Sequence, residues 1–183
     1  HRALQSKGLD SVLIDAGENA VAQVKAAEAE LAFIALHGAF GEDGRIQTLL
    51  EDANIPYTGS GPEACRRSMD KEVSRELFRK AGLPEPRWKV LRDPQALLPA
   101  ELELPLFVKP CRGGSSIGVT QVRSAAEWAK GLAAAMAEDD KAMVESKITG
   151  REMAVGILGD HALAAIEIRP AREFYDYTAK YTN

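Results

Sequence analysis

The chain has 183 residues, of which 45% are hydrophobic and 27% charged, and its formal net charge is -4. This composition suits one large or two small globular domains with their own cores. The slight negative charge argues against a general nucleic-acid-binding or anionic-membrane surface, since both need a basic excess or cluster. Any basic site must therefore be local.

Cysteine usage and chain ends set further bounds. Cys65 and Cys111 are too few and too isolated for a disulfide framework or a zinc site, and they predict reduced thiols in a cytoplasmic protein. No apolar run has the length of a membrane span, and no signal peptide is recognisable. The chain starts at His1, its first methionine is Met69, and it stops in the polar run "YTAKYTN", so we expect part of a longer protein.

The first third of the chain alternates helix and strand patterns. A helix that Gly8 ends precedes a strand at 10–16, an alanine-rich helix at 20–30 and a continuous apolar strand at 31–38. Apolar residues at helical spacing predict another helix at 46–53. Because a continuous apolar strand is typical of a sheet covered on both faces, this region predicts βαβ units with a parallel sheet.

A second unit is predicted to begin near Gly61. Ser68 can cap a helix that presents Met69, Val73, Leu77 and Ala81 on one face and ends at Gly82.

Downstream of Gly82, strand and hairpin patterns predominate. "LPLFVKP", "IGVTQV" and "AMVESKI" are predicted strands, and "EMAVGIL" and "HALAAIEI" flank a "GD" hairpin turn. "SAAE" at 124–127 predicts a capping box before a helix with Trp128, Leu132 and Met136 on one face. The second unit is thus mixed and rich in hairpins.

The loop in "FVKPCRGGSSIGV" has two interpretations. It is not a Walker loop, because Lys109 precedes the glycines and strand residues follow them. Backbone amides at 113–114, serine hydroxyls at 115–116 and the charges of Lys109 and Arg112 could together hold a phosphate. A plain β-hairpin with a solvated tip explains the same composition.

Other polar residues follow predicted strands. His37 ends a strand, where ligands bind in open α/β sheets, or it is a structural histidine. Glu42 and Asp43 are metal ligands or charges at a helix N-terminus, and we favour the second. Glu145 and Glu152 could accept hydrogen bonds from amino or hydroxyl groups, or be solvated loop carboxylates. The aromatic and basic run "FYDYTAKYTN" predicts a surface that faces a ligand or a partner.

Taken in order, the segments "HGAFGEDG", "PYTGSG", "SMDK", "GLPEP", "LPLFVKPCRGGSSIGV", "VESKITGREMAV" and "FYDYTAKY" closely resemble the D-alanine:D-alanine ligase family of ATP-grasp enzymes. The resemblance spans about residue 31 to the end. It implies an α/β and α+β fold: an incomplete N-terminal pre-ATP-grasp domain with a partial parallel sheet at 1–62, then an ATP-grasp domain with mixed and antiparallel sheets at 63–183. The small subdomain would be 63–147, and 148–183 would begin the large subdomain.

The resemblance also implies an activity. Family members join two D-alanine molecules for peptidoglycan synthesis with ATP and two Mg²⁺ ions: ATP phosphorylates one carboxylate, and the second amine attacks the acyl phosphate through a tetrahedral intermediate. We expect a cytoplasmic homodimer that binds no nucleic acid and no membrane. A non-catalytic ATP-grasp module and an ATP-grasp ligase of another specificity are the alternatives.

For the phosphates and the chemistry, the resemblance implies contacts from Lys71, Lys109 and Lys180. The loop Gly113–Gly118 would fold over the phosphates. Its contacts with the nucleotide would come from Gly113, Gly114, Ser115, Ser116 and Gly118. Ser115 would also bind the mobile loop that Tyr181 closes. His37 would lie near the second D-alanine, and Tyr181 favours D-alanine as the second substrate.

For the nucleoside, the resemblance implies that Glu145 takes the adenine amino group. Ser146 and Ile148 would add backbone contacts to the base, and Glu152 would bind the ribose. The family often has an aromatic residue against the adenine, where this chain has Lys147. The magnesium ligands are expected beyond Asn183, and we expect these 183 residues alone to be inactive.

Overall fold

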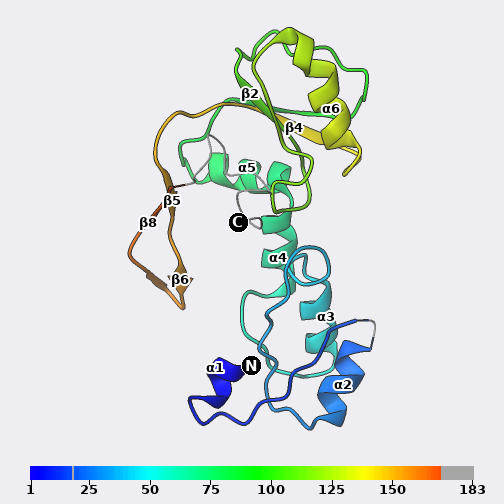
Figure 1. The fold of residues 1–183 in the computed structure, drawn as a ribbon, viewed down its shortest axis with the longest axis vertical. Helices are drawn as coiled ribbons and strands as arrows, with labels where there is room; N and C mark the ends of the chain where they lie inside the picture. Colours follow the sequence, from blue (N-terminus) through cyan, green and yellow to red (C-terminus); the bar gives the residue numbers. More distant parts are fainter. Residues whose placement is uncertain (18, 170–183) are drawn as a thin grey trace. The chain divides into compact units, whose positions relative to one another are not determined.

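The computed structural model describes residues 1–17 and 19–169. It divides the chain into two compact units, His1–Met69 and Asp70–Asn183 (Figure 1). The sequence-based domain boundary at residue 62 remains a prediction. Among the described residues, no helix combines the length and apolarity needed to cross a membrane.

The regular elements of the first unit, as far as the structure describes it, are helices joined by irregular segments. Its helices are α1 (Arg2–Gln5), α2 (Ala20–Ala26), α3 (Arg45–Asp52) and α4 (Pro62–Met69). Apolar residues one turn apart on α2 and α3 face each other, as the helical spacing in the sequence predicts. The buried cluster comprises Ala20, Val24, Ile46, Leu50 and Ile55.

The two strands predicted in this unit do not form as such. The segments 10–16 and 31–38 run without ladder pairing, apart from one parallel bridge between Ala32 and Tyr57. That bridge has the predicted parallel direction, but a strand also requires a neighbour that completes its hydrogen bonds. Within the described part of this unit neither segment has one, and Leu13 and Phe33 remain 76% and 60% exposed.

The second unit contains a four-stranded antiparallel sheet. Its strands are β1 (Trp88–Leu91), β2 (Leu106–Pro110), β3 (Thr120–Val122) and β4 (Ala142–Ser146), in the order β1-β4-β2-β3. The three segments predicted as strands at β2, β3 and β4 are therefore confirmed. The register places Phe107 opposite Glu145 and Lys109 opposite Met143.

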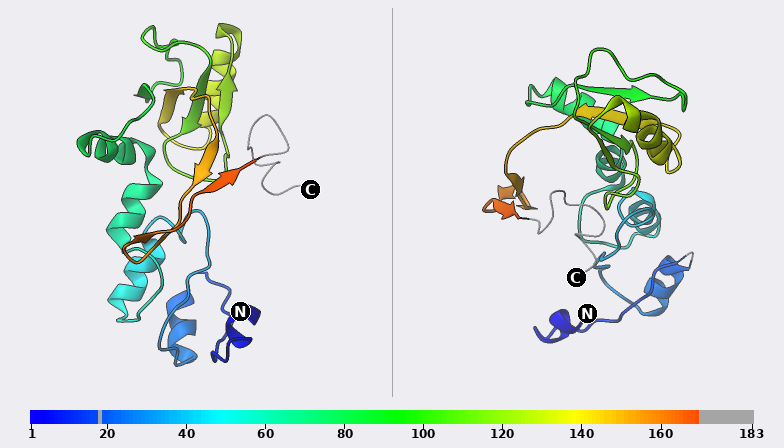
Figure 2. Two further views of the ribbon diagram at one scale, coloured as in Figure 1. Left: turned by 90° about the vertical axis from the view of Figure 1, so that its left-hand side faces the viewer. Right: turned by 45° about the horizontal axis from the view of Figure 1, so that its top comes forward.

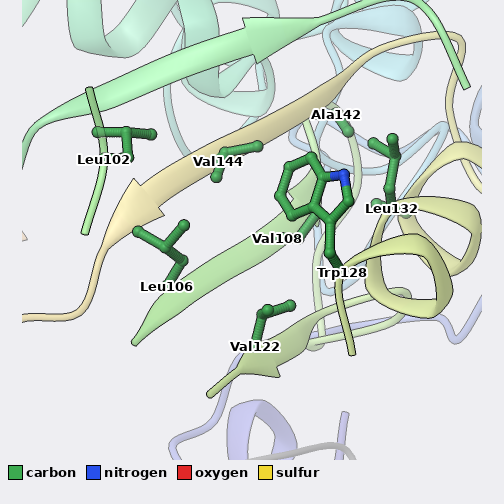
Figure 3. Packing of buried hydrophobic residues seen from close by; sticks show 9 residues of the cluster. Leu102, Leu106, Val108, Val122, Trp128, Leu132, Ala142 and Val144 are labelled. Carbon is green, nitrogen blue, oxygen red and sulfur yellow. The ribbon is translucent and has the colours of Figure 1, made fainter. Parts of the chain in front are cut away.

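One face of this sheet is a hydrophobic core covered by α6 (Trp128–Met136) (Figures 1 and 2). Leu106 and Val108 of β2 point to this face and are fully buried, whereas Phe107 and Lys109 alternate to the other face. Figure 3 shows the Trp128 indole beside Val108, and its Nε1 donates to the Ala96 carbonyl oxygen at 2.8 Å. The predicted apolar face of this helix is confirmed.

The helix starts differ from the predicted ones. Helix α5 (Lys71–Lys80) begins after Asp70, whose carboxylate accepts hydrogen bonds from the backbone N–H groups of Glu72 and Val73. The predicted cap, Ser68, instead lies inside α4. Asp70 takes the cap position because it directly precedes the first turn of α5, where its carboxylate can accept from the backbone N–H groups.

The predicted capping box does not form. A 3-10 turn, η1 (Ala125–Glu127), precedes α6, and the Ser124 side chain makes no cap hydrogen bond. The Glu127 carboxylate does reach back, but it accepts from the Arg123 N–H at 2.7 Å, one residue before the predicted donor.

The end of the described chain forms a twisted two-stranded ribbon (Figure 2). Strand β5 (Glu152–Ala154) pairs with β8 (Ile166–Ile168), and β6 (Ile157–Leu158) pairs with β7 (His161–Ala162). Gly159 takes a φ of 62° in the turn, a left-handed conformation that suits glycine. The hairpin predicted around "GD" is confirmed.

The core under α6 makes a first prediction. Leu132 is 1% exposed, so Leu132→Ala should lower the free energy of unfolding by about 2–5 kcal/mol through lost burial and a residual cavity. Urea titration followed by tryptophan fluorescence measures the change. Leu97→Ala is the control, because Leu97 is 87% exposed and should cost less than about 0.5 kcal/mol. Equal losses for both variants would contradict the assigned core.

Candidate nucleotide-binding site

The glycine loop connects two neighbouring antiparallel strands, β2 and β3, so it is a hairpin loop in its topology. Its backbone is unusual for a simple turn. Gly113, Ser115, Ser116 and Gly118 all have positive φ, at 99°, 54°, 60° and 68°. Turns with such conformations can align backbone N–H groups into a concavity that suits an anion. The hairpin and phosphate-loop interpretations are therefore compatible.

A cavity of about 350 Å³ opens between this loop and the sheet face opposite α6. Cations, loop backbone and apolar side chains all contribute to its wall. The lining residues are Lys71, Phe107, Lys109, Gly113, Gly114, Ser115, Ser116, Ile117, Val119 and Glu145.

Lys71 reaches the loop from the first turn of α5. Its Nζ donates to the Gly113 carbonyl oxygen at 2.9 Å and lies 3.4 Å from that of Cys111. Burial, together with the nearby ammonium of Lys109, lowers the pKa of Lys71. Two cations on the wall of one cavity repel each other, and an anion bound between them would relieve this repulsion.

Glu145 lies on β4 at the other side of the cavity and is 8% exposed. One carboxylate oxygen, Oε1, forms an ion pair with Lys109, and the other, Oε2, accepts from Arg75 Nη2 at 2.8 Å. All three side chains are largely withdrawn from water, with exposed fractions of 10% to 20%. The carboxylate is thus compensated from two directions.

The start of the loop is fixed by an acidic pair after α6. Arg112 forms ion pairs with Asp139 and Asp140, and its backbone N–H donates to the Asp139 carboxylate at 2.7 Å. Burial raises the pKa of Asp139, but hydrogen bonds from the Arg112 side chain and backbone outweigh it, and the net pKa is lowered. Arg112 therefore holds the loop base and is not among the residues that line the cavity.

A second charged network positions the start of α5. Lys141 Nζ donates to Asp70 at 2.8 Å and to Glu72 at 2.7 Å, and Arg92 also pairs with Glu72 at 3.0 Å. The Lys71 backbone N–H donates to the Cys111 carbonyl oxygen at 2.9 Å. Lys71 is thereby held between two anchored neighbours, and this fixes where its side chain enters the cavity.

The remaining predicted residues lie elsewhere or cannot be placed. Gly118 lets the loop pack closely against Glu138, because a Cβ at this position would come within 2.9 Å of Glu138 Cγ. Ser146, Ile148 and Glu152 lie outside the cavity lining, on or after the end of β4. His37 is exposed and belongs to the first unit. Lys180 and Tyr181 lie outside the described residues.

Residues 1–17 and 19–169 contain no group of three or more His, Cys, Asp or Glu side chains that could hold a metal ion. Asp43 accepts from the backbone N–H of Arg45 at 3.2 Å, the first residue of α3, so it acts at a helix N-terminus as favoured from the sequence. Glu42 accepts from the Gly38 N–H at 2.6 Å.

Sequence reasoning missed two residues of the site. Phe107 lines the cavity beside Lys109, and period-two alternation along β2 already indicates that both side chains share a face. Arg75 stands four residues after Lys71, and the helical repeat places both on one side of α5. Its partner Glu145 is 70 residues away, which the sequence does not reveal.

An antiparallel sheet whose glycine-loop hairpin, two lysines and a buried carboxylate line one cavity is the arrangement expected of a protein with the ATP-grasp fold. Models of the D-ala D-ala ligase N-terminus and C-terminus match residues 6–60 and 77–183. The chain belongs to the D-alanine:D-alanine ligase family.

Curated relatives align with nearly the whole of this chain. The D-alanine–D-alanine ligases of Laribacter hongkongensis and Geotalea uraniireducens are both 46% identical, over 98% and 100% of this chain. Each alignment covers 59% of the relative, so the chain spans about three fifths of these proteins.

Two solved structures resemble this chain. The Bacillus anthracis D-alanine–D-alanine ligase is 32% identical with a TM-score of 0.77, covering 95% of this chain and 58% of that one. The Coxiella burnetii enzyme is 33% identical with a TM-score of 0.68, covering 76% and 42%. The predicted family and ATP-grasp fold class are confirmed.

The close packing around Gly118 leads to a second prediction. Gly118→Ala should lower the free energy of unfolding by about 1–3 kcal/mol, because an added methyl meets Glu138 Cγ at 2.9 Å and the Ala134 carbonyl oxygen at 3.2 Å in a left-handed residue. Thermal denaturation measures the loss. Gly114→Ala is the matched control, since its methyl meets nothing within 4 Å. The assigned packing fails if both variants melt together.

The charged network at the start of α5 leads to a third prediction. Lys141→Met should cost about 1–3 kcal/mol at neutral pH, because it leaves Asp70 and Glu72 without their shared cation. Burial raises the pKa of Asp70, but the hydrogen bonds from Lys141 and the backbone lower it by more, so the net pKa is below its usual value. The pKa of Glu72 is also lowered, chiefly by Lys141.

A carboxyl group whose pKa is lower in the folded protein than in the unfolded chain stabilises the fold at pH values above its unfolded pKa of about 4. This stabilisation is lost as the pH falls through the folded pKa. The gap between wild type and Lys141→Met should therefore shrink below about pH 4. Urea titrations across the pH range test this, with Lys130→Met, an exposed lysine of α6, as the control. A gap that is constant with pH would rule out the ionic role.

Proposed function

We propose that the protein containing this chain joins two D-alanine molecules with ATP to form D-alanyl-D-alanine, through an acyl phosphate, for peptidoglycan synthesis. The observation that carries the proposal is the convergence of Lys71, Lys109, the glycine loop and Glu145 on one cavity of about 350 Å³. Cations and amides suit phosphates, and a carboxylate suits the amino group of a base.

The phosphate end would be formed by the loop and the two lysines. Gly113 and Gly114 leave open space where side chains would stand, so backbone amides can approach a phosphate closely. The Ser115 and Ser116 hydroxyls line the same wall. Charge builds up on the oxygens of a transferring phosphoryl group, and fixed cations stabilise it without reorganisation.

The base would lie toward Glu145 and Phe107. Glu145 would accept a hydrogen bond from the adenine amino group, while the apolar side chains of Phe107, Ile117 and Val119 line the cavity near it. Ser146, Ile148 and Glu152 would complete the contacts with base and ribose from the segment after β4.

The chemistry requires two substrates and ATP to be held together. The γ-phosphoryl group moves to the carboxylate of the first D-alanine and ADP leaves; the amine of the second then attacks the acyl carbon and phosphate leaves. Within the proposal, His37 lies near the second D-alanine, Lys180 contacts phosphate, and Ser115 and Tyr181 act on the mobile loop. Mg²⁺ would neutralise phosphate charge through ligands outside the described residues. A cytoplasmic homodimer belongs to the same proposal.

The fourth prediction tests Lys109. In the complete protein, ADP formation should require D-alanine, and Lys109→Ala should reduce it by about a hundredfold or more, because a partly buried cation that would contact the phosphates is lost. A coupled ADP assay over a panel of amino acids measures both effects.

Lys89→Ala is the control, since Lys89 pairs with Glu101 on the exposed side of β1 and should keep normal activity. Turnover that survives Lys109→Ala excludes the phosphate role. Turnover with another amino acid and none with D-alanine assigns the protein to a differently specific ligase, and ATP binding without any turnover assigns it to a non-catalytic module.

A further inference from the structure

The structure points to a further residue of the nucleotide site that does not itself line the cavity. We propose that Arg75 is a positioning residue for adenine recognition: it holds the Glu145 carboxylate in place when Lys109 turns to the nucleotide phosphates. The inference rests on the proposed ATP-binding function and adds a specificity determinant to it.

The geometry separates the two partners of Glu145. Arg75 Nη2 binds Oε2 at 2.8 Å, and Lys109 binds the other oxygen, Oε1. Lys109 and Glu145 line the cavity, and Arg75 stands behind Glu145 on α5, outside the lining. Arg75 therefore touches a ligand there through the carboxylate that it holds and not directly.

The charges require such a second partner. Lys109 Nζ would divide its three donors between Glu145 and a phosphate, so nucleotide binding would weaken its hold on Oε1. A carboxylate that is 8% exposed would then be less well compensated, which is costly, unless another cation stays with it. Arg75, itself 20% exposed, occupies that place and is fixed by α5.

The same exchange would prepare the site for adenine. With Oε2 held by Arg75, Oε1 becomes available to accept the N–H of a 6-amino group. A base with an oxo group at that position offers an acceptor, which the carboxylate repels. Arg75 should thus contribute to selectivity between ATP and ITP, which differ at this group.

The fifth prediction measures binding by calorimetry on the complete protein, with Mg²⁺ and either ATP or ITP. Arg75→Met should weaken ATP binding about tenfold and reduce the ATP-over-ITP preference to a similar extent, because the carboxylate is no longer held. Arg75→Lys should restore most of both, since a single nitrogen makes the contact. Lys80→Met, which removes an exposed cation from the same helix, should leave both unchanged.

A double-mutant cycle keeps the test independent of folding losses. Glu145→Gln removes the charge that Arg75 compensates, so adding Arg75→Met to it should change the ATP dissociation constant less than about twofold. Equal losses from Arg75→Met in both backgrounds, or full ATP-over-ITP selectivity in Arg75→Met, would overturn the inference alone. A wild-type protein that binds ATP and ITP equally would overturn it together with the adenine role of Glu145.

Discussion

Taking a carboxylate out of water costs several kcal/mol unless cations accompany it, and the second unit is arranged around one such group. Glu145 sits on β4, in the middle of the sheet, with 8% of its surface exposed. Its negative charge is compensated by Lys109 on the adjacent strand and by Arg75 on α5, and both side chains contact its carboxylate. The site is therefore held by the same charges that a nucleotide would use.

The sheet makes this arrangement rigid. Antiparallel pairing of β2 and β4 sets Phe107 opposite Glu145 and Lys109 opposite Met143, so the lysine and the carboxylate share a face two residues apart. The alternate residues of the same strands pack under α6 into a fully buried core. A shift in register would therefore cost core packing and charge pairing together.

Sequence patterns predicted much of this because strands, hairpin turns and an apolar helix face are local signals. They located β2, β3, β4, the glycine loop and the Trp128 face, and the family resemblance added the roles that we propose for Lys109 and Glu145. They failed where the outcome depends on distant partners. Asp70, and not Ser68, starts α5, and the Asp70 carboxylate also pairs with Lys141, 71 residues away. Apolar runs at 10–16 and 31–38 signal strands, but hydrogen-bonded ladders need neighbours that the runs themselves do not encode.

The close packing at Gly118 links the glycine loop to α6 and the turn that follows this helix. Because Gly118 has no side chain, the loop lies directly against the Ala134 carbonyl oxygen in α6 and against Glu138, two residues after α6 ends, and neither residue lines the cavity. Variation at those positions is constrained by the shape of the loop as well as by the core. Substitutions at these two positions can therefore change the shape of the loop without altering any residue that lines the cavity.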